Sequence, residues 1–252
     1  MFNLLQIKNH KIDKNPMNRG LTGLYSNMPR ELNSTISSYN ESVSDIFISN
    51  PFLLSVSDTY FSSKYKVMII GQETYCWFGE RNEGIYSASN PINELMNLYD
   101  LFVNNPSRNY NSPFWQYVND LTDLATQHNI GLIINNLAKI GFNKGVGYNT
   151  VINAYFDCVF REEIRICNPN MILFLSGPNY DSLIRERLGD FSITDCIPGI
   201  PQRKFGKLFF EDEYLNKIEI YRTYHPGYLR RVRNKSPWVT QIDQYIHKLL
   251  VE

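Results

Sequence analysis

The feature that most constrains the fold is the alternation of short apolar runs with longer segments of helical character. Lys66–Ile70, Gly131–Ile134 and Met171–Leu175 are typical of buried strands, and Lys217–Tyr224 is a fourth β-rich run. Strands that alternate with helices indicate a mainly parallel sheet that is covered on both faces. We therefore predict an α/β fold of three layers, α/β/α, around a central, mainly parallel, four-stranded sheet.

The helices between these runs have recognisable start signals. Asn90-Pro91 and Ser112-Pro113 each offer an N-cap residue followed by proline at the first helical position. The expected helices are Glu31–Ser49, Ile92–Val103, Pro113–Gln127, Thr150–Ile166, Tyr180–Leu188 and Pro237–Leu250. A further β-rich run lies at Lys207–Phe210.

No linker or repeat divides the chain. Its 252 residues suit one sizeable α/β domain. Residues 1–60 are polar and rich in Asn and Ser, and we interpret them as an N-terminal elaboration of the same domain. The prediction is a single domain over residues 1–252.

Polar turns follow two of the predicted strands, far apart in the chain. The first is Gly71-Gln72-Glu73-Thr74-Tyr75, and the second is His225-Pro226-Gly227-Tyr228-Leu229. Ligand sites of open α/β sheets lie outside the carboxyl ends of the strands, so these turns are expected to converge on one crevice. A carboxylate, an amide and an imidazole that meet there suit acid–base or electrostatic catalysis.

The same residues resemble a known family. Gly71-Gln72-Glu73-Thr74-Tyr75 resembles the Gly-Gln-Asp-Pro-Tyr motif of uracil-DNA glycosylases, and His225-Pro226-Gly227-Tyr228-Leu229 resembles their His-Pro-Ser-Pro-Leu loop. Two shorter stretches, Ile134–Lys139 and Leu173–Gly177, are similar to the strand-end Asn motif and the Leu-Leu-Trp-Gly strand of that family. The resemblance spans about Lys66 to Arg231. It implies a uracil-DNA-glycosylase-like fold and a monofunctional DNA glycosylase that acts in base excision.

The resemblance also implies roles for individual residues. Glu73 takes the place of the family Asp that positions water and balances the charge of the sugar cation. His225 takes the place of the histidine that hydrogen-bonds the base carbonyl as negative charge develops. Asn136 is the candidate for reading the Watson–Crick edge of the base, because a carboxamide both donates and accepts. Asn135, one residue away and facing oppositely in a strand, is the rival assignment.

Further positions correspond to base and DNA contacts. Gln72 and Tyr75 belong to the first motif and are expected to contact the base, while Tyr86 corresponds to a stacking Phe. Leu229 corresponds to the wedge that fills the hole left by a flipped base, and we expect it to be exposed. The residues expected to contact DNA phosphates are Gly227, Arg230, Arg231 and Arg233, beside Lys235.

Three departures from the family pattern bear on the substrate. Thr74 replaces proline, Gly227 replaces serine and Ser176 replaces tryptophan. The first alternative is therefore a glycosylase for a bulky modified pyrimidine in foreign (phage) DNA, as antiviral defence. The others are a catalytically silent DNA-binding module of the same fold and an unrelated α/β hydrolytic enzyme that uses Glu73 and His225 on a small molecule.

The composition limits the kinds of partner and cofactor that we expect. The 25 basic and 25 acidic residues cancel, so only the local arginine cluster points to DNA. Four cysteines (Cys76, Cys158, Cys167 and Cys196) lack metal-ligand spacing, and we expect no metal, no iron–sulfur cluster and no cofactor. The absence of a signal sequence and of a long apolar run predicts a cytoplasmic protein without a membrane partner. We expect a monomer.

Overall fold

The computed structural model of the protein describes residues 15–26, 49–74, 77, 91–104, 112–141 and 157–251. The described residues pack as two compact units. The first unit draws on Met1–Asp58, Glu73–Pro106 and Asn136–Cys167, and the second draws on Thr59–Gln72, Ser107–Asn135 and Asn168–Glu252. Each unit is considered by itself below, and the single-domain prediction stays a prediction.

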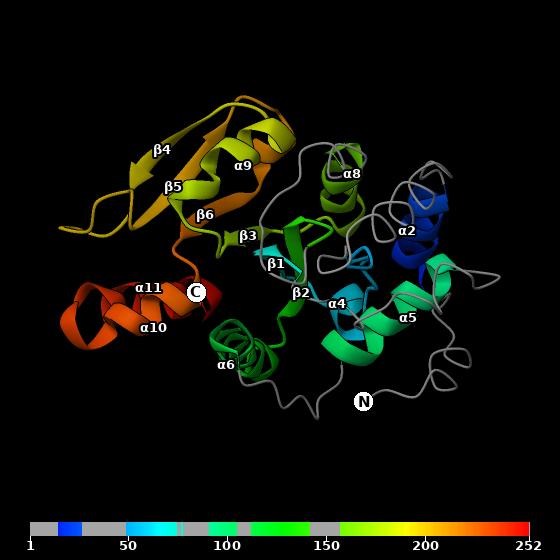
Figure 1. The fold of residues 1–252 in the computed structure, drawn as a ribbon, viewed down its shortest axis with the longest axis horizontal. Coiled ribbons are helices and arrows are strands. Elements are labelled where there is room, and N and C mark those ends of the chain that lie inside the picture. Colours follow the sequence, from blue (N-terminus) through cyan, green and yellow to red (C-terminus); the bar gives the residue numbers. More distant parts are fainter. Residues whose placement is uncertain are drawn as a thin grey trace, which may run out of the picture. The chain divides into compact units, whose positions relative to one another are not determined.

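A six-stranded sheet occupies most of the second unit (Figure 1). Its strands are β1 (Lys66–Glu73), β2 (Gly131–Ala138), β3 (Met171–Phe174), β4 (Phe191–Asp195), β5 (Phe205–Phe210) and β6 (Glu219–Thr223). Their spatial order is β2-β1-β3-β6-β5-β4. β1 pairs with β3 and β3 with β6 in parallel, whereas β5 runs antiparallel to both β6 and β4.

The predicted α/β class is confirmed, but the expected count of four strands is wrong. The antiparallel pair β5–β4 extends the sheet beyond β6. β4 is difficult to recognise in the sequence. Only Phe191 of this edge strand is buried, and the rest of the strand has little apolar character. β3, by contrast, is buried along its whole length, as expected for a central parallel strand.

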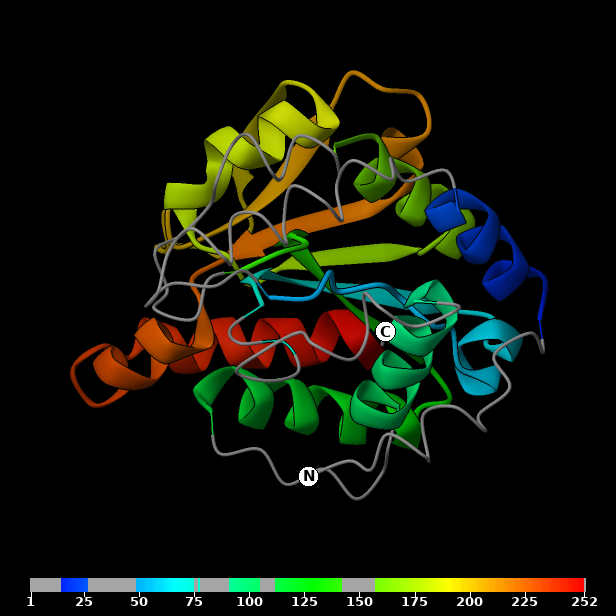
Figure 2. The same ribbon diagram turned by 45° about the vertical axis from the view of Figure 1, so that its right-hand side comes forward.

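Helices of the second unit lie on both sides of this sheet. They are α6 (Pro113–Gln127), α9 (Asp181–Leu188), α10 (Pro226–Val232) and α11 (Trp238–Val251). Figure 2 shows α6 and α11 on one side of the sheet and α9 on the other. α6 begins as the sequence predicts, because the Ser112 side chain accepts a hydrogen bond of 3.2 Å from the Trp115 N–H and Pro113 follows the cap.

The first unit is mainly helical within the described residues. It contains α2 (Pro16–Ser26), α5 (Pro91–Val103) and α8 (Asp157–Cys167), and α4 (Asp58–Ser62) leads from it towards β1. A fully buried ion pair holds this unit together: Lys139 Nζ lies 2.5 Å from Glu163 Oε2, and both side chains are 0% exposed. The Tyr25 hydroxyl donates to Glu163 Oε1 at 2.6 Å, and Lys139 Nζ donates to the Phe52 carbonyl oxygen.

The element boundaries differ from the predictions at several places. β1 continues to Glu73, so Gln72 and Glu73 lie inside the strand rather than in a turn after it, and α2 and α4 were not expected. β2 continues to Ala138, so Asn135 and Asn136 lie inside the strand rather than after it. Of the long helix expected at Thr150–Ile166, the described residues show Asp157–Cys167. Residues 31–48 of the first expected helix lie outside the described residues.

Candidate functional site

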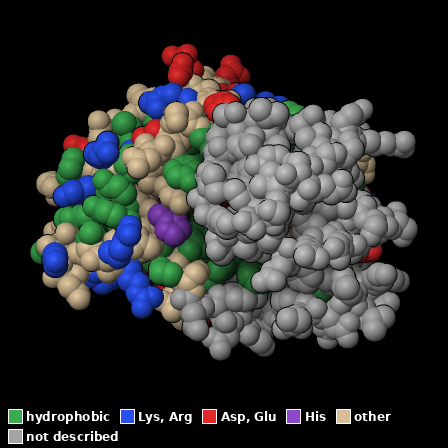
Figure 3. Space-filling model, viewed as in Figure 1, with side chains coloured by type: hydrophobic (Ala, Val, Ile, Leu, Met, Phe, Trp, Pro, Cys, Tyr) green, Lys and Arg blue, Asp and Glu red, His purple; other side chains and the backbone are tan. Residues whose placement is uncertain are grey.

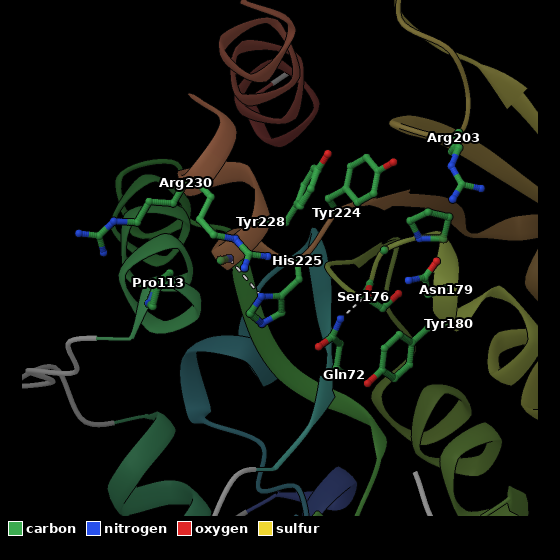
Figure 4. A pocket seen from close by; sticks show the side chains of 14 residues that line it. Gln72, Pro113, Ser176, Asn179, Tyr180, Arg203, Tyr224, His225, Tyr228 and Arg230 are labelled. Carbon is green, nitrogen blue, oxygen red and sulfur yellow. Dashed lines mark hydrogen bonds between the residues drawn. The ribbon is translucent and has the colours of Figure 1, made fainter. Parts of the chain in front are cut away.

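A cavity of about 970 Å³ opens at the carboxyl ends of β3 and β6, entirely within the second unit (Figure 4). Its volume is near the upper end of the ~300–1,000 Å³ typical of ligand pockets. The described residues that line it are Gln72, Pro113, Ser176, Gly177, Pro178, Asn179, Tyr180, Arg203, Tyr224, His225, Gly227, Tyr228, Arg230 and Arg231. The expectation that a site forms at this sheet edge therefore has a matching cavity.

The wall of this cavity is cationic. It contains Arg203, Arg230 and Arg231, and no Asp or Glu is found among the described residues that line it. Figure 3 shows Lys and Arg side chains around a histidine on the described part of this face. Because the whole chain has a formal charge of +0, this local excess of positive charge favours an anionic ligand.

His225 stands at the start of α10 and acts as its N-cap. Its Nδ1 accepts a hydrogen bond of 3.1 Å from the Gly227 N–H. An imidazole nitrogen that accepts carries no proton, so the neutral ring has its hydrogen on Nε2. The ring stacks on Phe114 of α6, with centroids 5.6 Å apart and planes 13° apart. The cap and the stacking together fix the position of the Nε2–H donor.

The surroundings of His225 also keep it neutral. Burial lowers the pKa of the imidazole, and the positive charge of Arg231 lowers that pKa further. The usual histidine pKa is about 6.5, so His225 is neutral at physiological pH. A neutral imidazole that donates from Nε2 stabilises an oxyanion as it forms, without a proton transfer.

Gly227 leaves room for this arrangement. A Cβ atom at position 227 would lie 3.1 Å from His225 Nδ1, tighter than nine in ten real Cβ contacts. A glycine at this position, where the glycosylase motif that the sequence resembles has serine, therefore avoids a close contact with the imidazole.

The amide of Gln72 is also held in one orientation. Its Nε2 donates a hydrogen bond of 2.7 Å to the Ser176 carbonyl oxygen. Oε1 remains an acceptor on the side of His225 (Figure 4). The Ser176 hydroxyl, on a residue that is 1% exposed, has no hydrogen-bond partner among the described residues. A buried hydroxyl without a partner is costly, so a ligand group that reaches it gains a hydrogen bond.

Five of the sequence-predicted residues line this cavity: Gln72, His225, Gly227, Arg230 and Arg231. Arg233 does not, and its guanidinium forms an ion pair of 2.9 Å with Asp243 of α11. The expectation of an exposed Leu229 is wrong. Leu229 is 1% exposed, because helix α10 begins at Pro226 and turns this side chain into the core.

Glu73 and Asn136 belong to the first unit and are not among the residues that line the cavity. Glu73 ends β1, and burial raises the pKa of its carboxyl. Its Oε2 is buried and has no hydrogen-bond partner in the described part of the chain. A carboxylate in such a setting is a candidate for function, since structural carboxylates are normally paired.

The residue after Glu73 shows why threonine stands where the family motif has proline. The Thr74 hydroxyl lies 2.9 Å from the Ser49 hydroxyl, which also accepts a hydrogen bond from the Gly141 N–H. Gly141 packs so closely that a Cβ atom there would overlap the Thr74 carbonyl oxygen. These contacts anchor the chain just after Glu73.

The two asparagines of β2 differ in their surroundings. Asn135 is 0% exposed, and its Nδ2 lies 3.9 Å from Met68 Sδ in the neighbouring strand. Asn136 is 6% exposed and, as the next residue of the strand, points to the opposite face. Neither asparagine is among the described residues that line the cavity, and the choice between them stays a prediction. Tyr75 and Tyr86 lie outside the described residues.

Sequence reasoning missed several residues of the cavity wall, notably Asn179, Tyr180, Arg203 and Tyr224, and also Phe114, which stacks on His225. Phe114 carries no motif and supports His225 from a helix more than 100 residues earlier. Asn179 and Tyr180 follow Ser176-Gly177 at the end of β3, so the rule that places ligands at strand ends offered a signal for them.

Comparison with known proteins adds no family assignment. No protein-family model matches the chain, and a search of curated proteins gives no significant match. No helix of the described residues is long and apolar enough to cross a membrane. Within the same residues, no cluster of three His, Cys, Asp or Glu side chains is placed to hold a metal ion.

Proposed function

We propose that the protein is a monofunctional DNA glycosylase that hydrolyses the N-glycosidic bond of a pyrimidine flipped out of DNA. The observation that carries the proposal is the neutral, Nε2–H form of His225 in a cavity with a cationic wall. DNA supplies the anion that this wall favours, and a flipped nucleotide supplies a base carbonyl for the imidazole.

The proposed step is a hydrolysis. The bond between C1′ and the base nitrogen breaks, and its electron pair leaves with the base, where it is shared with the O2 oxygen. The His225 Nε2–H donates to that oxygen as its charge grows, which lowers the barrier because the donor is already in place. Water adds to the oxocarbenium-like sugar at C1′ and releases its proton to solvent. Glu73 keeps the role of positioning this water as a prediction from the resemblance.

Gln72 supports a preference among pyrimidines. One N–H of Gln72 Nε2 donates to the Ser176 carbonyl oxygen, and the Oε1 acceptor lies on the side of His225. Uracil-type bases carry an N3–H beside the O2 oxygen, whereas cytosine has an unprotonated N3 at that place. The pair of His225 Nε2–H and Gln72 Oε1 therefore matches a uracil-type edge better than a cytosine edge.

A substrate survey tests the proposal. The protein is incubated with single- and double-stranded oligonucleotides that carry uracil, modified pyrimidines or the normal bases, and alkali then cleaves any abasic site. We expect cleavage at one class of pyrimidine, and much slower cleavage by His225→Ala. DNA binding without cleavage would identify a silent binding module, and neither binding nor cleavage would favour a small-molecule enzyme.

One observation favours a bulky modified pyrimidine over plain uracil. The described lining of the cavity of about 970 Å³ includes hydrogen-bonding side chains of Asn179, Tyr180 and Arg203 and the unpartnered Ser176 hydroxyl, besides Gln72 and His225. An oxygen-bearing substituent on the base, as in the modified bases of some phage DNA, would find hydrogen-bond partners among these groups. Ser176→Ala should then slow excision of the modified base and leave excision of uracil unchanged. If Ser176→Ala keeps the wild-type rate on the modified base as well as on uracil, plain uracil is favoured as the substrate.

A further inference from the structure

The helix that follows His225 presents a different residue to DNA from the one that the motif indicates. Leu229 is 1% exposed, whereas Tyr228 is 37% exposed and lines the mouth of the cavity. The two residues are neighbours in α10, and this helix turns Leu229 towards the core and Tyr228 towards solvent. The apolar wedge of the family motif is therefore buried in this chain, and an aromatic ring occupies the rim.

The surroundings of Tyr228 suit contact with stacked bases. The centroid of its ring lies 4.5 Å from that of Tyr224 (Figure 4). The Arg231 guanidinium lies 6.0 Å from the Tyr228 ring, and exposed Arg230 of the same helix donates a hydrogen bond of 2.8 Å to Gln116 Oε1. An aromatic ring with cations nearby suits contact with the bases and phosphates of DNA.

We propose that Tyr228 is the residue that unstacks the duplex beside the extruded nucleotide, in place of Leu229. This inference rests on the proposed function and adds a positioning residue to it. The ring enters the base stack where the nucleotide has left and stacks on the neighbouring base, while Arg230 and Arg231 hold the flanking phosphates.

If Tyr228 unstacks the duplex, replacing it should slow excision from duplex DNA more than excision from single strands. A flipped nucleotide in a duplex leaves a gap that must be filled, whereas a single strand needs little unstacking. Tyr228→Ala should slow excision from duplex by about tenfold or more and from single strands by about threefold at most. Tyr228→Phe keeps the ring and should restore the duplex rate.

Two control variants isolate the effect. Phe209 is a comparably exposed aromatic residue of β5, outside the cavity wall, and Phe209→Ala should leave both rates unchanged. Leu229→Ala removes a core side chain, so it should lower the unfolding midpoint and keep the wild-type ratio of duplex to single-strand rates.

A binding measurement makes the test independent of excision. The duplex carries 2-aminopurine opposite the target nucleotide, and its fluorescence rises when that base pair opens and the 2-aminopurine becomes less stacked. We expect the wild type and Tyr228→Phe to raise the fluorescence, and Tyr228→Ala to bind without raising it.

The outcomes are distinct for the two proposals. If the wild type excises a base but Tyr228→Ala slows duplex and single strand equally, the glycosylase proposal stands and Tyr228 is only part of the cavity wall. If no oligonucleotide is cleaved, the glycosylase proposal is wrong, and the fluorescence alone decides whether Tyr228 distorts DNA. A wild-type protein that leaves the fluorescence unchanged would overturn the role of Tyr228.

Discussion

Lys139 in the first unit and the three arginines of the cavity in the second unit carry the same charge in opposite settings. Lys139 is 0% exposed and lies 2.5 Å from Glu163, which also accepts a hydrogen bond from Tyr25. Arg203, Arg230 and Arg231 are exposed, and the described part of their cavity wall has no carboxylate. The first cation is neutralised within the fold, whereas the others leave their field open to a ligand.

The second unit also contains a buried cation that is paired within the fold. The contrast therefore depends on the surroundings of each cation and not on the unit to which it belongs. Arg222 of β6 is buried, lies 3.1 Å from Asp181 and donates to the Arg203 carbonyl oxygen. It ends a strand beside the cavity but is not among the residues that line it. Buried Arg222 thus has a carboxylate partner within the fold, whereas the exposed arginines of the cavity have no carboxylate in the described wall.

The largest expected effect concerns Lys139. Lys139→Met leaves the Glu163 carboxylate buried without its partner, so we expect a loss of about 3–5 kcal/mol in the free energy of unfolding. Arg231→Met, in the cavity wall, should change it by less than about 0.5 kcal/mol. Urea unfolding followed by circular dichroism measures both. The double variant Lys139→Met/Glu163→Leu should recover part of the loss, and equal stabilities of the two single variants would contradict the comparison.

A smaller effect is expected for the arginines in DNA binding. Replacing Arg230 or Arg231 by Ala should weaken binding to all sequences similarly and flatten the plot of log affinity against log salt by about 0.9 for each lost phosphate contact. Arg233 is the matched control from the same sequence cluster, because Asp243 already engages it. Fluorescence anisotropy at several salt concentrations gives the slopes. An equal change in Arg233→Ala would mean that the whole cluster acts as a diffuse surface charge.

The smallest expected effect is the pH profile of excision. Burial raises the pKa of Glu73 and, with Arg231, lowers that of His225, whose usual values are about 4.3 and 6.5. Both working forms, the carboxylate and the neutral imidazole, are lost as pH falls. Single-turnover rates should therefore be flat above pH 7 and decline only on the acid side of about pH 6.5. A rate that declines as pH rises through 6–7 would show that the imidazolium is the working form.

Local signals in the sequence predict much of the fold. Proline after a capping residue fixes the start of α6, and continuous apolar runs mark β1 and β3 because both strands are buried. β2 is longer than predicted because tertiary pairing with β1 extends it through Asn135 and Asn136, residues that rarely favour strands. Pairing between strands that are far apart in the chain cannot be read from the local sequence of either strand.

The candidate site is predictable only in part for the same reason. The two motifs indicate Gln72, at the end of β1, and His225 and the arginines, after β6. The exchange of Tyr228 and Leu229 depends on where α10 begins relative to the core, which no five-residue motif specifies. Phe114 reaches His225, and Arg203 reaches the cavity wall, from distant segments, so only the folded chain shows that they belong to the site.

The most direct test of the central claim compares rate and affinity in His225→Ala. Single-turnover excision and DNA binding are measured on the substrate that the survey identifies, with Phe209→Ala as the control. We predict that His225→Ala lowers the excision rate by about 10²–10³-fold and leaves the dissociation constant within a few-fold, because the lost hydrogen bond forms mainly in the transition state. An undiminished rate, or an equal loss of rate and affinity, would contradict the assignment of His225 as the residue that stabilises the departing base.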